Sequence, residues 1–350
     1  MGPTPVRGSS KGKQRRPDRG TATTLVEVAR LANVSAITVS RTIRNKGPIT
    51  QRTRERVLAA IREIGYVPNR IAGSLASSDS NLMGVIIPSL SNIVFPEVLN
   101  GINAALEESG FQPVVGVTNY DIEAEEKLVR SLLAWKPAAM IITGFDHTEA
   151  TRRMLEQSGI RIAELMDIDK APMDIAVGLS HHRAGYDTGR YLIERGYRRF
   201  GYVGHDWVAD RRARMRFDGL ELALREAGLA MAGQAIVDGP SSTQAGRVML
   251  AGLLRRKPKI DVAVFSNDDM AVGGVFHCFA KGIALKGQLA IFGFNGLDIG
   301  QALPVPLSTI RSNRYLIGRT AVEKIIEGPK RAGIPIVIDT GFEIVAGGTA

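Results

Sequence analysis

The sequence has a single cysteine, Cys278, in 350 residues, so no disulfide bond can form within one chain. Cys278 lies in the apolar helical pattern AVGGVFHCFA, where we expect it to pack as a small hydrophobic residue. No apolar run reaches about 18 residues, so we expect no membrane-spanning helix and no membrane partner. The N-terminal stretch lacks the apolar segment of a signal peptide, which predicts a cytoplasmic protein.

Catalytic and metal-binding patterns are also missing. The five histidines show none of the spacings typical of a metal site. No strand is followed by G-x-S-x-G, a phosphate-binding loop or G-x-G-x-x-G. Asp268 and Asp269 form a carboxylate pair, but adjacent residues on a helix point in different directions. We therefore expect no enzymatic activity, no cofactor and no metal.

Charge is distributed unevenly along the chain. Residues 1–80 contain 15 Lys and Arg against 5 Asp and Glu, whereas the remaining 270 residues contain 30 of each. The entire formal net charge of +10 thus falls in the first quarter of the chain. A basic head on a neutral body is typical of a protein that binds a polyanion. For residues 7–19 alone, a solvated basic tail explains the charge equally well.

Three short helices are predicted after residues 1–22, which are too polar to order themselves. Thr24 and Glu27 have the spacing of a capping box at the start of the first helix. Asn33 tolerates the left-handed backbone of a tight turn, and Ser35 opens a second helix. Thr50 caps a third helix, which Gly65 ends.

This arrangement predicts a helix-turn-helix unit. Leu25, Val28, Ala29 and Ala32 share one face of the first helix, and apolar residues of the second helix point inward. Polar residues of the second helix, Arg41 among them, point outward on a strongly basic unit. Three-helix cores also occur without DNA, but the charge favours a DNA-binding role.

The rest of the chain has a different pattern. Residues 70–80 are only weakly helical, because Gly73 and four serines interrupt the apolar residues, and they are interpreted as a linker. From Leu82 onward, apolar runs such as LMGVIIP, FQPVVGV, AAMIIT, IRIAELM, DIAVGL, FGYVG, DVAVFS and LAIFGF alternate with helical stretches. Runs this apolar are typical of buried parallel strands, so we expect two doubly wound α/β lobes that bind ligands at the carboxyl ends of their strands.

The head and the residues that follow it resemble a known family. VARLANVSAITVSRTI, TRERVLAAIREIGYVPNR and IAGSLAS are similar to the headpiece of the lactose/galactose repressor (LacI) family. The resemblance continues through LMGVIIPSLSN, SNDDMAVG, AIFGFN and PLSTIR, and so covers about residues 24–350. Within the family, ELMD, DIAVG and GFNGLDIGQ are most similar to the gluconate-operon repressor subgroup.

The resemblance implies a transcriptional regulator, most simply a repressor, with a small all-α head and a body like that of periplasmic binding proteins. It implies the following domains: a disordered tail (1–22), a helix-turn-helix domain (23–69), a hinge helix or linker (70–80), an N-lobe (81–179 with 312–337) and a C-lobe (180–311 with 338–350).

The resemblance also implies the DNA contacts. Ala36 and Ile37 take the first base-reading positions of the recognition helix, and Arg41 takes the third. Arg41 can donate two hydrogen bonds to guanine, although a phosphate contact or a surface ion pair is the alternative. Phosphate contacts are expected from Thr24, Ser35, Ser40, Thr50 and Thr53, each of which can also serve as a helix cap or exposed polar residue.

Two residues of the linker complete the predicted DNA-binding surface. Asn69 matches the start of the family's hinge helix, and Leu75 matches the leucine that is inserted into the minor groove. Alternatively, Leu75 packs within a linker helix. Because paired leucines require two chains, we expect a homodimer on a near-palindromic duplex operator.

Effector-binding residues are implied at the ends of strands. Asp167, Arg216, Asn267 and Asn295 match pocket residues of sugar-binding repressors. Where the family often has aspartate, Asn295 is neutral, which suits an acidic sugar such as gluconate. Arg216 would bind the carboxylate or hydroxyls, although Arg211, Arg212 and Arg214 are close in sequence.

Simpler roles for these residues remain open. Asp167 and Asn295 can cap turns, and Asn267 can cap a helix. Ser89, Asn92 and Thr143 are further pocket candidates. A sugar-binding protein without a DNA role and a sugar-acid-processing enzyme are the alternative functions.

Overall fold

The computed structural model describes residues 23–67, 80–107, 109–208, 210–256, 259–328 and 333–350. The chain divides into two compact units, Met1–Ser77 and Ser78–Ala350, and each is described by itself. The predicted tail (1–22), Asn69 and Leu75 lie outside the described residues.

The first unit is a head of three helices, and the predicted caps are confirmed. The helices are α1 (Leu25–Leu31), α2 (Ala36–Ile43) and α3 (Gln51–Ile64). Thr24 and Glu27 form the capping box, in which the Glu27 Oε2 accepts a hydrogen bond of 2.7 Å from the Thr24 backbone N–H. Ser35 and Thr50 cap α2 and α3, and Gly65 ends α3 with a left-handed φ of 64°.

A small apolar core holds the head together. The turn between α1 and α2 contains Asn33 with a φ of 49°, as predicted. The fully or almost fully buried side chains of this core are Val28, Ala29, Ala32, Val39, Val57 and Ala60. Its members come from all three helices, so the outward face of α2 depends on the packing of all three.

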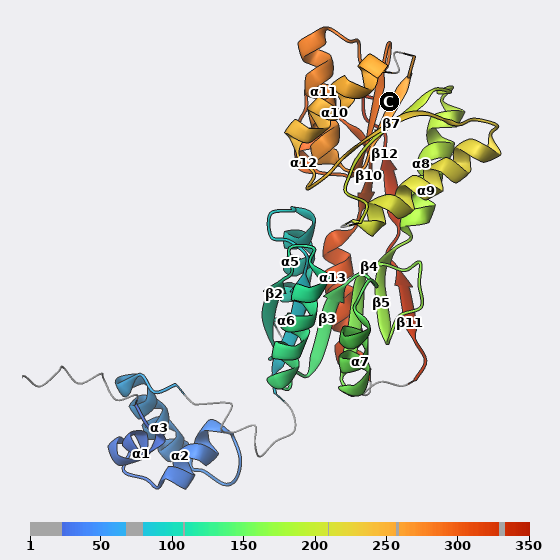
Figure 1. Ribbon diagram of the computed structural model, residues 1–350. Helices are drawn as coiled ribbons and strands as arrows, with labels where there is room; N and C mark the ends of the chain where they lie inside the picture. The colour runs from blue at the N-terminus through green and yellow to red at the C-terminus, as the bar shows by residue number, and fades with distance from the viewer. Residues whose placement is uncertain (1–22, 68–79, 108, 209, 257–258, 329–332) are drawn as a thin grey trace, which may run out of the picture. The chain divides into compact units, whose positions relative to one another are not determined.

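The second unit contains two six-stranded sheets, which define its two lobes (Figure 1). The N-lobe sheet has the order β11-β5-β4-β3-β1-β2, and the C-lobe sheet has the order β12-β10-β9-β8-β6-β7. The N-lobe strands are β1 (Leu82–Ile87), β2 (Gln112–Val117), β3 (Ala139–Thr143), β4 (Arg161–Asp167), β5 (Ile175–Leu179) and β11 (Ile336–Asp339). The C-lobe strands are β6 (Phe200–His205), β7 (Met231–Val237), β8 (Val262–Phe265), β9 (Ala290–Asn295), β10 (Ser308–Ser312) and β12 (Phe342–Val345).

Helices pack on both sheets. Those of the N-lobe are α5 (Val94–Leu106), α6 (Ile122–Ala134), α7 (Glu149–Gln157) and α13 (Arg314–Glu327). Those of the C-lobe are α8 (His181–Glu194), α9 (Arg211–Glu226), α10 (Thr243–Arg256), α11 (Asp268–Lys281) and α12 (Asp298–Gln301). The predicted fold class, a helix-turn-helix head with two α/β lobes, is confirmed.

The chain passes between the lobes at three places. These are the connections from β5 to α8, from β10 to α13 and from β11 to β12. All described pairings are parallel except that of β12 with β10. The reason is topological: β11 runs parallel to its neighbour β5, and the chain then enters the other sheet after two residues. β12 therefore starts at the end of the C-lobe sheet where β10 finishes.

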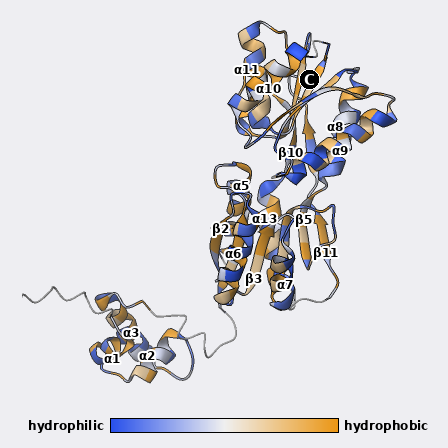
Figure 2. Cartoon of the chain, in the orientation of Figure 1, coloured by the Kyte–Doolittle hydropathy of each residue, from blue (hydrophilic) through white to orange (hydrophobic). Residues whose placement is uncertain are grey.

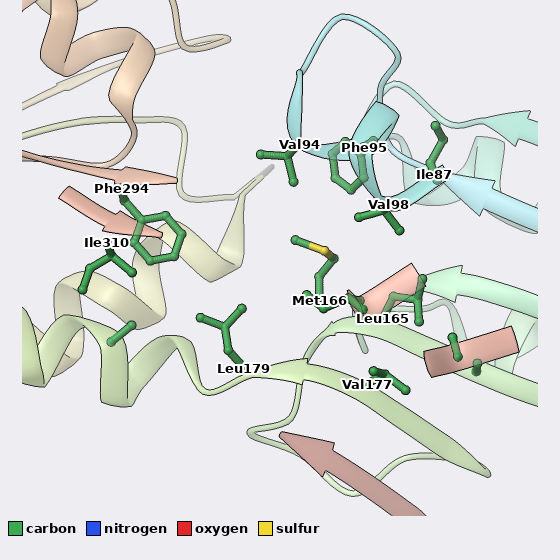
Figure 3. Packing of buried hydrophobic residues seen from close by; sticks show 14 of the residues in the cluster. Ile87, Val94, Phe95, Val98, Leu165, Met166, Val177, Leu179, Phe294 and Ile310 are labelled. Atoms are coloured by element: carbon green, nitrogen blue, oxygen red, sulfur yellow. The ribbon is translucent and has the colours of Figure 1, made fainter. Parts of the chain in front are cut away.

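Apolar strands form the interior, as Figure 2 shows by the hydrophobic colour of both sheets. One buried cluster contains residues of both lobes. In Figure 3, Met166 and Leu179 lie between Ile87 of the N-lobe and Phe294 of the C-lobe. This packing places the carboxyl ends of the strands of both sheets around the region between the lobes.

Eight predicted strand runs are confirmed, but one is less buried than expected. FQPVVGV forms β2, an edge strand whose Val115 is 43% exposed, because it has a neighbour on one side only. Three of the four strands without a predicted run, β7, β11 and β12, are also edge strands. Among the described residues, no helix has the length and apolar character needed to cross a membrane.

Candidate functional site

The outward face of α2 carries the predicted base-reading residues. Ile37 is 66% exposed, Arg41 is exposed, and Ala36 is half-buried. Ser35 uses its hydroxyl to cap the helix, where it accepts a hydrogen bond of 3.2 Å from the Thr38 backbone N–H. Ser40 is half-buried on the same helix. The surface thus presents one apolar side chain and one guanidinium, with a capped helix start beside them.

The described part of the head has an excess of cations. Residues 23–67 contain 8 Lys and Arg and 3 Asp and Glu, a difference of +5. Within the described residues, the Arg41 guanidinium has no hydrogen-bond or ion-pair partner. The alternative of a surface ion pair within the head is therefore not observed. The hydroxyls of Thr50 and Thr53 bond to each other at 2.9 Å, so both take part in the cap of α3.

In the second unit, the predicted effector residues lie at carboxyl ends of strands. Thr143 ends β3, Asp167 ends β4 and Asn295 ends β9. Asn267 is the second residue after the end of β8. We call this region, together with the first turns of α8 and α9, the interlobe site. Ligands of open parallel sheets bind at such strand ends.

Arg216 is the central cation of the interlobe site. It lies in α9 and is only 9% exposed. Its Nη1 lies 3.0 Å from the His181 Nδ1, and its Nη2 donates to the Ser266 carbonyl at 2.9 Å. The guanidinium carbon lies 3.9 Å from the centre of the Phe294 ring, and the buried Nε has no partner. Burial lowers the pKa of Arg216, while the charge of Asp210 acts in the opposite direction. No described carboxylate lies within ion-pair distance of the Arg216 guanidinium.

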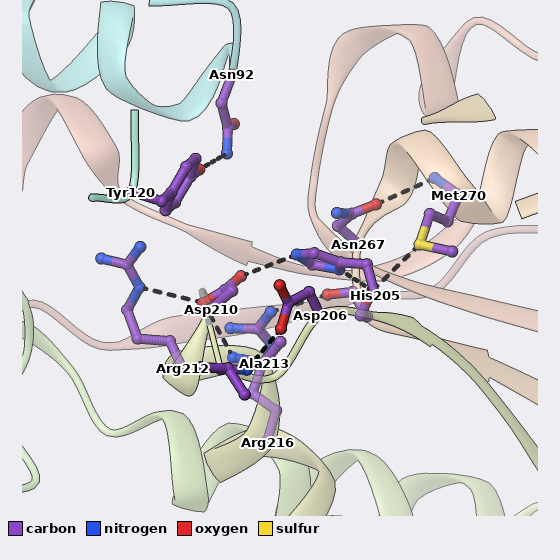
Figure 4. A network of polar contacts seen from close by, with 12 residues as sticks. Asn92, Tyr120, His205, Asp206, Asp210, Arg212, Ala213, Arg216, Asn267 and Met270 are labelled. Carbon is purple, nitrogen blue, oxygen red and sulfur yellow. Dashed lines mark hydrogen bonds and ion pairs between the residues drawn. The ribbon is translucent and has the colours of Figure 1, made fainter. Parts of the chain in front are cut away.

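Arg212, one turn earlier in α9, is the second cation. Its guanidinium lies 5.8 Å from the Phe95 ring of the N-lobe and 3.6 Å from the Asp210 Oδ1 (Figure 4). Burial raises the pKa of Asp210, but the hydrogen bond from His205 and the charges of Arg212 and Arg216 hold it well below its usual range. Asp210 therefore stays ionised, and it also caps α9.

Asp167 combines a structural and an electrostatic role. It is 4% exposed, and its Oδ1 accepts a hydrogen bond of 2.9 Å from the Asp169 backbone N–H, so the turn-capping alternative is observed. Burial raises the pKa of Asp167, while the Arg212 charge acts in the opposite direction. The positive charge of Arg212 thus favours the ionised form of Asp167.

The two asparagines differ. Asn267 caps α11 by accepting from the Met270 backbone N–H at 3.0 Å, which leaves its Nδ2 without a described partner. Asn295 caps no described helix, because Leu297 takes the N-cap position of α12. Its φ of 123° is unusual for a non-glycine residue, and its carbonyl accepts from Arg314. The Asn295 amide itself has no partner within the described residues.

The N-lobe candidates Ser89, Asn92 and Thr143 form hydrogen bonds within their own lobe. Ser89 accepts from the backbone of Ser91 and Asn92. Asn92 accepts from the Val94 backbone and donates from Nδ2 to the Tyr120 hydroxyl at 3.0 Å. Thr143 donates to a carbonyl of β1 at 3.1 Å. In Figure 4, Tyr120 lies between Asn92 and Arg212, so Asn92 remains a candidate for the interlobe site.

Ion pairs lie around the interlobe site. Asp146 of the N-lobe contacts Arg211 of the C-lobe at 3.4 Å and Lys170 at 3.1 Å. The next residue, His147, is fully buried between Glu125 (2.6 Å) and Glu164 (3.6 Å). Burial alone lowers the pKa of His147, but hydrogen bonds to both carboxylates raise it to about 9.

Sequence reasoning missed several residues of this site. Arg212 was noted only as a neighbour of Arg216, whereas the structure places it beside Phe95. The partner residues His181, His205, Asp210 and Tyr120 were not identified, because no local pattern distinguishes them. The seven-residue stretch DRRARMR, with a capping aspartate and alternating arginines, was the one available signal.

Together, the basic helix-turn-helix head and the two-lobed body, whose interlobe site contains Arg212 and Arg216, define a ligand-responsive DNA-binding regulator. Residues 24–69 match the family model for bacterial regulatory proteins of the lacI family. Residues 80–338 match the model for periplasmic binding proteins and the sugar-binding domain of the LacI family. The chain belongs to the LacI family of transcriptional regulators.

Individual relatives agree with this assignment. The chain is 38% identical to the HTH-type transcriptional regulator GntR of Pseudomonas aeruginosa, over 94% of this chain and 97% of the relative. It is 34% identical to GntR of Escherichia coli, over 93% of this chain and 98% of that protein. A solved LacI-family regulator from Silicibacter pomeroyi is 45% identical with a TM-score of 0.89, over 93% of this chain and 99% of that one.

Proposed function

We propose that this regulator binds a sugar acid such as gluconate in the interlobe site, and that occupancy of this site controls its affinity for operator DNA. It acts in the cytoplasm, as a homodimer on a near-palindromic operator, and performs no catalysis. The predicted domain boundaries, DNA contacts and effector contacts are part of this proposal.

One observation carries the choice of an acidic effector. Arg216 is buried, yet it has no carboxylate partner among the described residues, and one of its N–H groups is unpaired. The charge of Asp210 acts on Arg216 from beyond ion-pair distance. A buried cation without a counter-ion in direct contact is costly, and an anionic ligand offsets that cost. The planar guanidinium also matches a carboxylate geometrically. Arg212 adds a second positive charge, and the neutral Asn295 adds no repulsion.

Calorimetric titration of the full chain tests the effector. Gluconate is expected to bind measurably more tightly than glucose, which has the same hydroxyl pattern on most carbons but no carboxylate. Arg216→Met and Arg212→Met should each weaken gluconate binding by about 10- to 100-fold, the value of a charged hydrogen bond. Arg225→Met, on an exposed part of the same helix, is the matched control and should bind normally. Equal binding of glucose and gluconate would contradict the acidic effector.

A second experiment tests the coupling to DNA. Genomic fragments retained by the full chain supply the operator, and fluorescence anisotropy then measures its dissociation constant with and without gluconate. A change of about 5- to 150-fold is expected for an allosteric coupling of this class. An unchanged operator affinity at saturating gluconate would refute control by this ligand.

A further inference from the structure

His181 occupies the point where the chain passes from one lobe to the other. β5 ends at Leu179 in the N-lobe sheet, and His181 is the first residue of α8 in the C-lobe. Its side chain is 2% exposed. It packs against the Phe294 ring, with ring centres 5.8 Å apart. A polar ring so deeply buried requires partners for both nitrogens.

Both partners are present, and together they determine the tautomer. The His181 Nε2 lies 2.8 Å from the Met166 carbonyl of β4, which can only accept a hydrogen bond. The Nδ1 lies 3.0 Å from the Arg216 Nη1, which can only donate. Nε2 must therefore carry the proton and Nδ1 must be unprotonated. A second proton on Nδ1 would point at the guanidinium, so the ring is neutral.

The charges around His181 agree with this geometry. Burial lowers the pKa of His181 well below its usual range, and the charges of Arg216 and Arg212 lower it further. The hydrogen bond to the Met166 carbonyl and the charge of Asp210, at the start of α9, raise the pKa of His181. They do not outweigh the effects of burial and of the two arginines.

Close backbone packing holds both ends of this contact. Met166 lies opposite Gly178 of β5, where a Cβ would overlap the Met166–Asp167 peptide. On the other side, a Cβ on Gly185, one turn after His181 in α8, would overlap the Arg216 carbonyl of α9. Helices α8 and α9 therefore pack closely next to the His181–Arg216 contact. Neither end can shift without moving a strand or a helix.

Met166 has an uncommon backbone conformation, with a φ of 77°. A left-handed conformation of a non-glycine residue costs energy and persists only where its surroundings hold it. Here the hydrogen bond from His181 holds the Met166 carbonyl, and Asp167 follows directly. The strained residue therefore lies between an effector candidate and the hydrogen bond that leads to Arg216.

We propose that His181, as the neutral Nε2–H tautomer, is the positioning residue for Arg216 and links that guanidinium to strand β4 of the N-lobe. A ligand that pulls on Arg216 in the C-lobe then also pulls on the Met166 carbonyl in the N-lobe. Its effect on effector binding rests on the proposed function, but the tautomer and its contacts do not.

The tautomer is tested without any ligand. Histidine is labelled with ¹⁵N in the full chain, and two-bond ¹H–¹⁵N spectra distinguish the two neutral tautomers and the charged ring. The chain has five histidines, and the His181 signals are those that disappear in His181→Asn or His181→Gln. A neutral Nε2–H ring throughout about pH 6–8, where an ordinary histidine titrates, supports the proposal. An Nδ1–H or charged ring overturns it.

Two substitutions separate the two contacts. The asparagine amide oxygen can take the place of Nδ1, so His181→Asn keeps the acceptor for Arg216 and loses the donor to Met166. The glutamine amide reaches the place of Nε2, so His181→Gln keeps the donor and loses the acceptor. His182→Gln, at the exposed neighbouring position, is the matched control.

The expected results differ for the two variants. His181→Gln should weaken gluconate binding by about 10-fold or more, because Arg216 loses a charged hydrogen bond. His181→Asn should bind gluconate within about 3-fold of the wild type but show a smaller ratio of operator affinities with and without gluconate. Equal behaviour of both variants and the control overturns the proposal. If the wild type binds no sugar acid, the proposed function fails, while the spectra still decide the His181 contacts.

Discussion

Replacing Asp268 with asparagine is expected to stabilise the C-lobe at neutral pH and to have no effect in acid. Asp268 is the first residue of α11 and is completely buried. Its Oδ1 accepts a hydrogen bond from the Thr309 hydroxyl and its Oδ2 accepts one from the Leu297 backbone N–H, both at 2.7 Å. It thus joins the start of α11 to β10 and to the loop after β9.

The magnitude follows from the pKa of Asp268. Burial is the largest influence and raises the pKa from 3.8 to about 6, despite the two hydrogen bonds and the Arg314 charge. This difference corresponds to about 3 kcal/mol between the protonated and ionised forms. Because the folded state binds the proton more tightly, the stabilisation is present at low pH and is lost as the pH rises through about 6.

Asparagine imitates the protonated carboxyl group. Its oxygen can accept from the Leu297 N–H, and its NH₂ can donate to the Thr309 hydroxyl, which itself lies 3.3 Å from the Ile310 carbonyl. We therefore expect the variant to be more stable than the wild type by up to about 3 kcal/mol above pH 7, with a difference near zero at pH 4.

Tryptophan fluorescence measures this effect. The chain has two tryptophans, and Trp135→Phe removes the exposed one in the N-lobe. Trp207, which packs on Tyr202 and Phe217 in the C-lobe, then reports urea unfolding at a series of pH values. Asp298→Asn, at an exposed position, is the control. A gap between variant and wild type that does not vary with pH, or a variant less stable at neutral pH, would refute the reasoning.

Three other predictions concern the head and the N-lobe. Thr24→Ala removes the capping box and should lower the stability of the head by about 1 kcal/mol, seen as faster hydrogen exchange of α1 amides in the full chain; unchanged exchange contradicts it. Arg41→Ala should lower the preference for operator over random duplex by about 1–3 kcal/mol in competition anisotropy, whereas an equal loss on both duplexes would indicate a phosphate contact. His147, with its pKa raised from 6.5 to about 9, contributes stability that is complete below about pH 6.5 and is lost as the pH rises through 9, up to about 3 kcal/mol. The stability difference between wild type and His147→Gln should therefore shrink between these pH values, and a constant difference would exclude a charged His147.

Local structure was predictable where the cause is local. A cap depends on a side chain and a backbone N–H three residues apart, so the capping residues of the head could be identified directly. Buried strands were equally visible, because a central strand of a parallel sheet must be apolar on both faces. Edge strands have a neighbour on one side only, and β7, β11 and β12 therefore lacked a continuous apolar run.

The interlobe site was only partly predictable. Arg216, Asp167, Asn267 and Asn295 were found through family resemblance. The resemblance could not show that the Asn267 side-chain oxygen caps a helix or that Arg216 has no carboxylate within ion-pair distance.

The order of residues along the chain determined the three helices of the head, the concentration of positive charge there and the alternating apolar segments of the body. Folding in three dimensions decided which polar groups are paired. Partners such as His181 and Met166, or Arg216 and Ser266, are separated in sequence and meet only where the folded chain brings their strands and helices together. It also decided that β12 runs antiparallel, since that direction depends on which lobe the chain has just left.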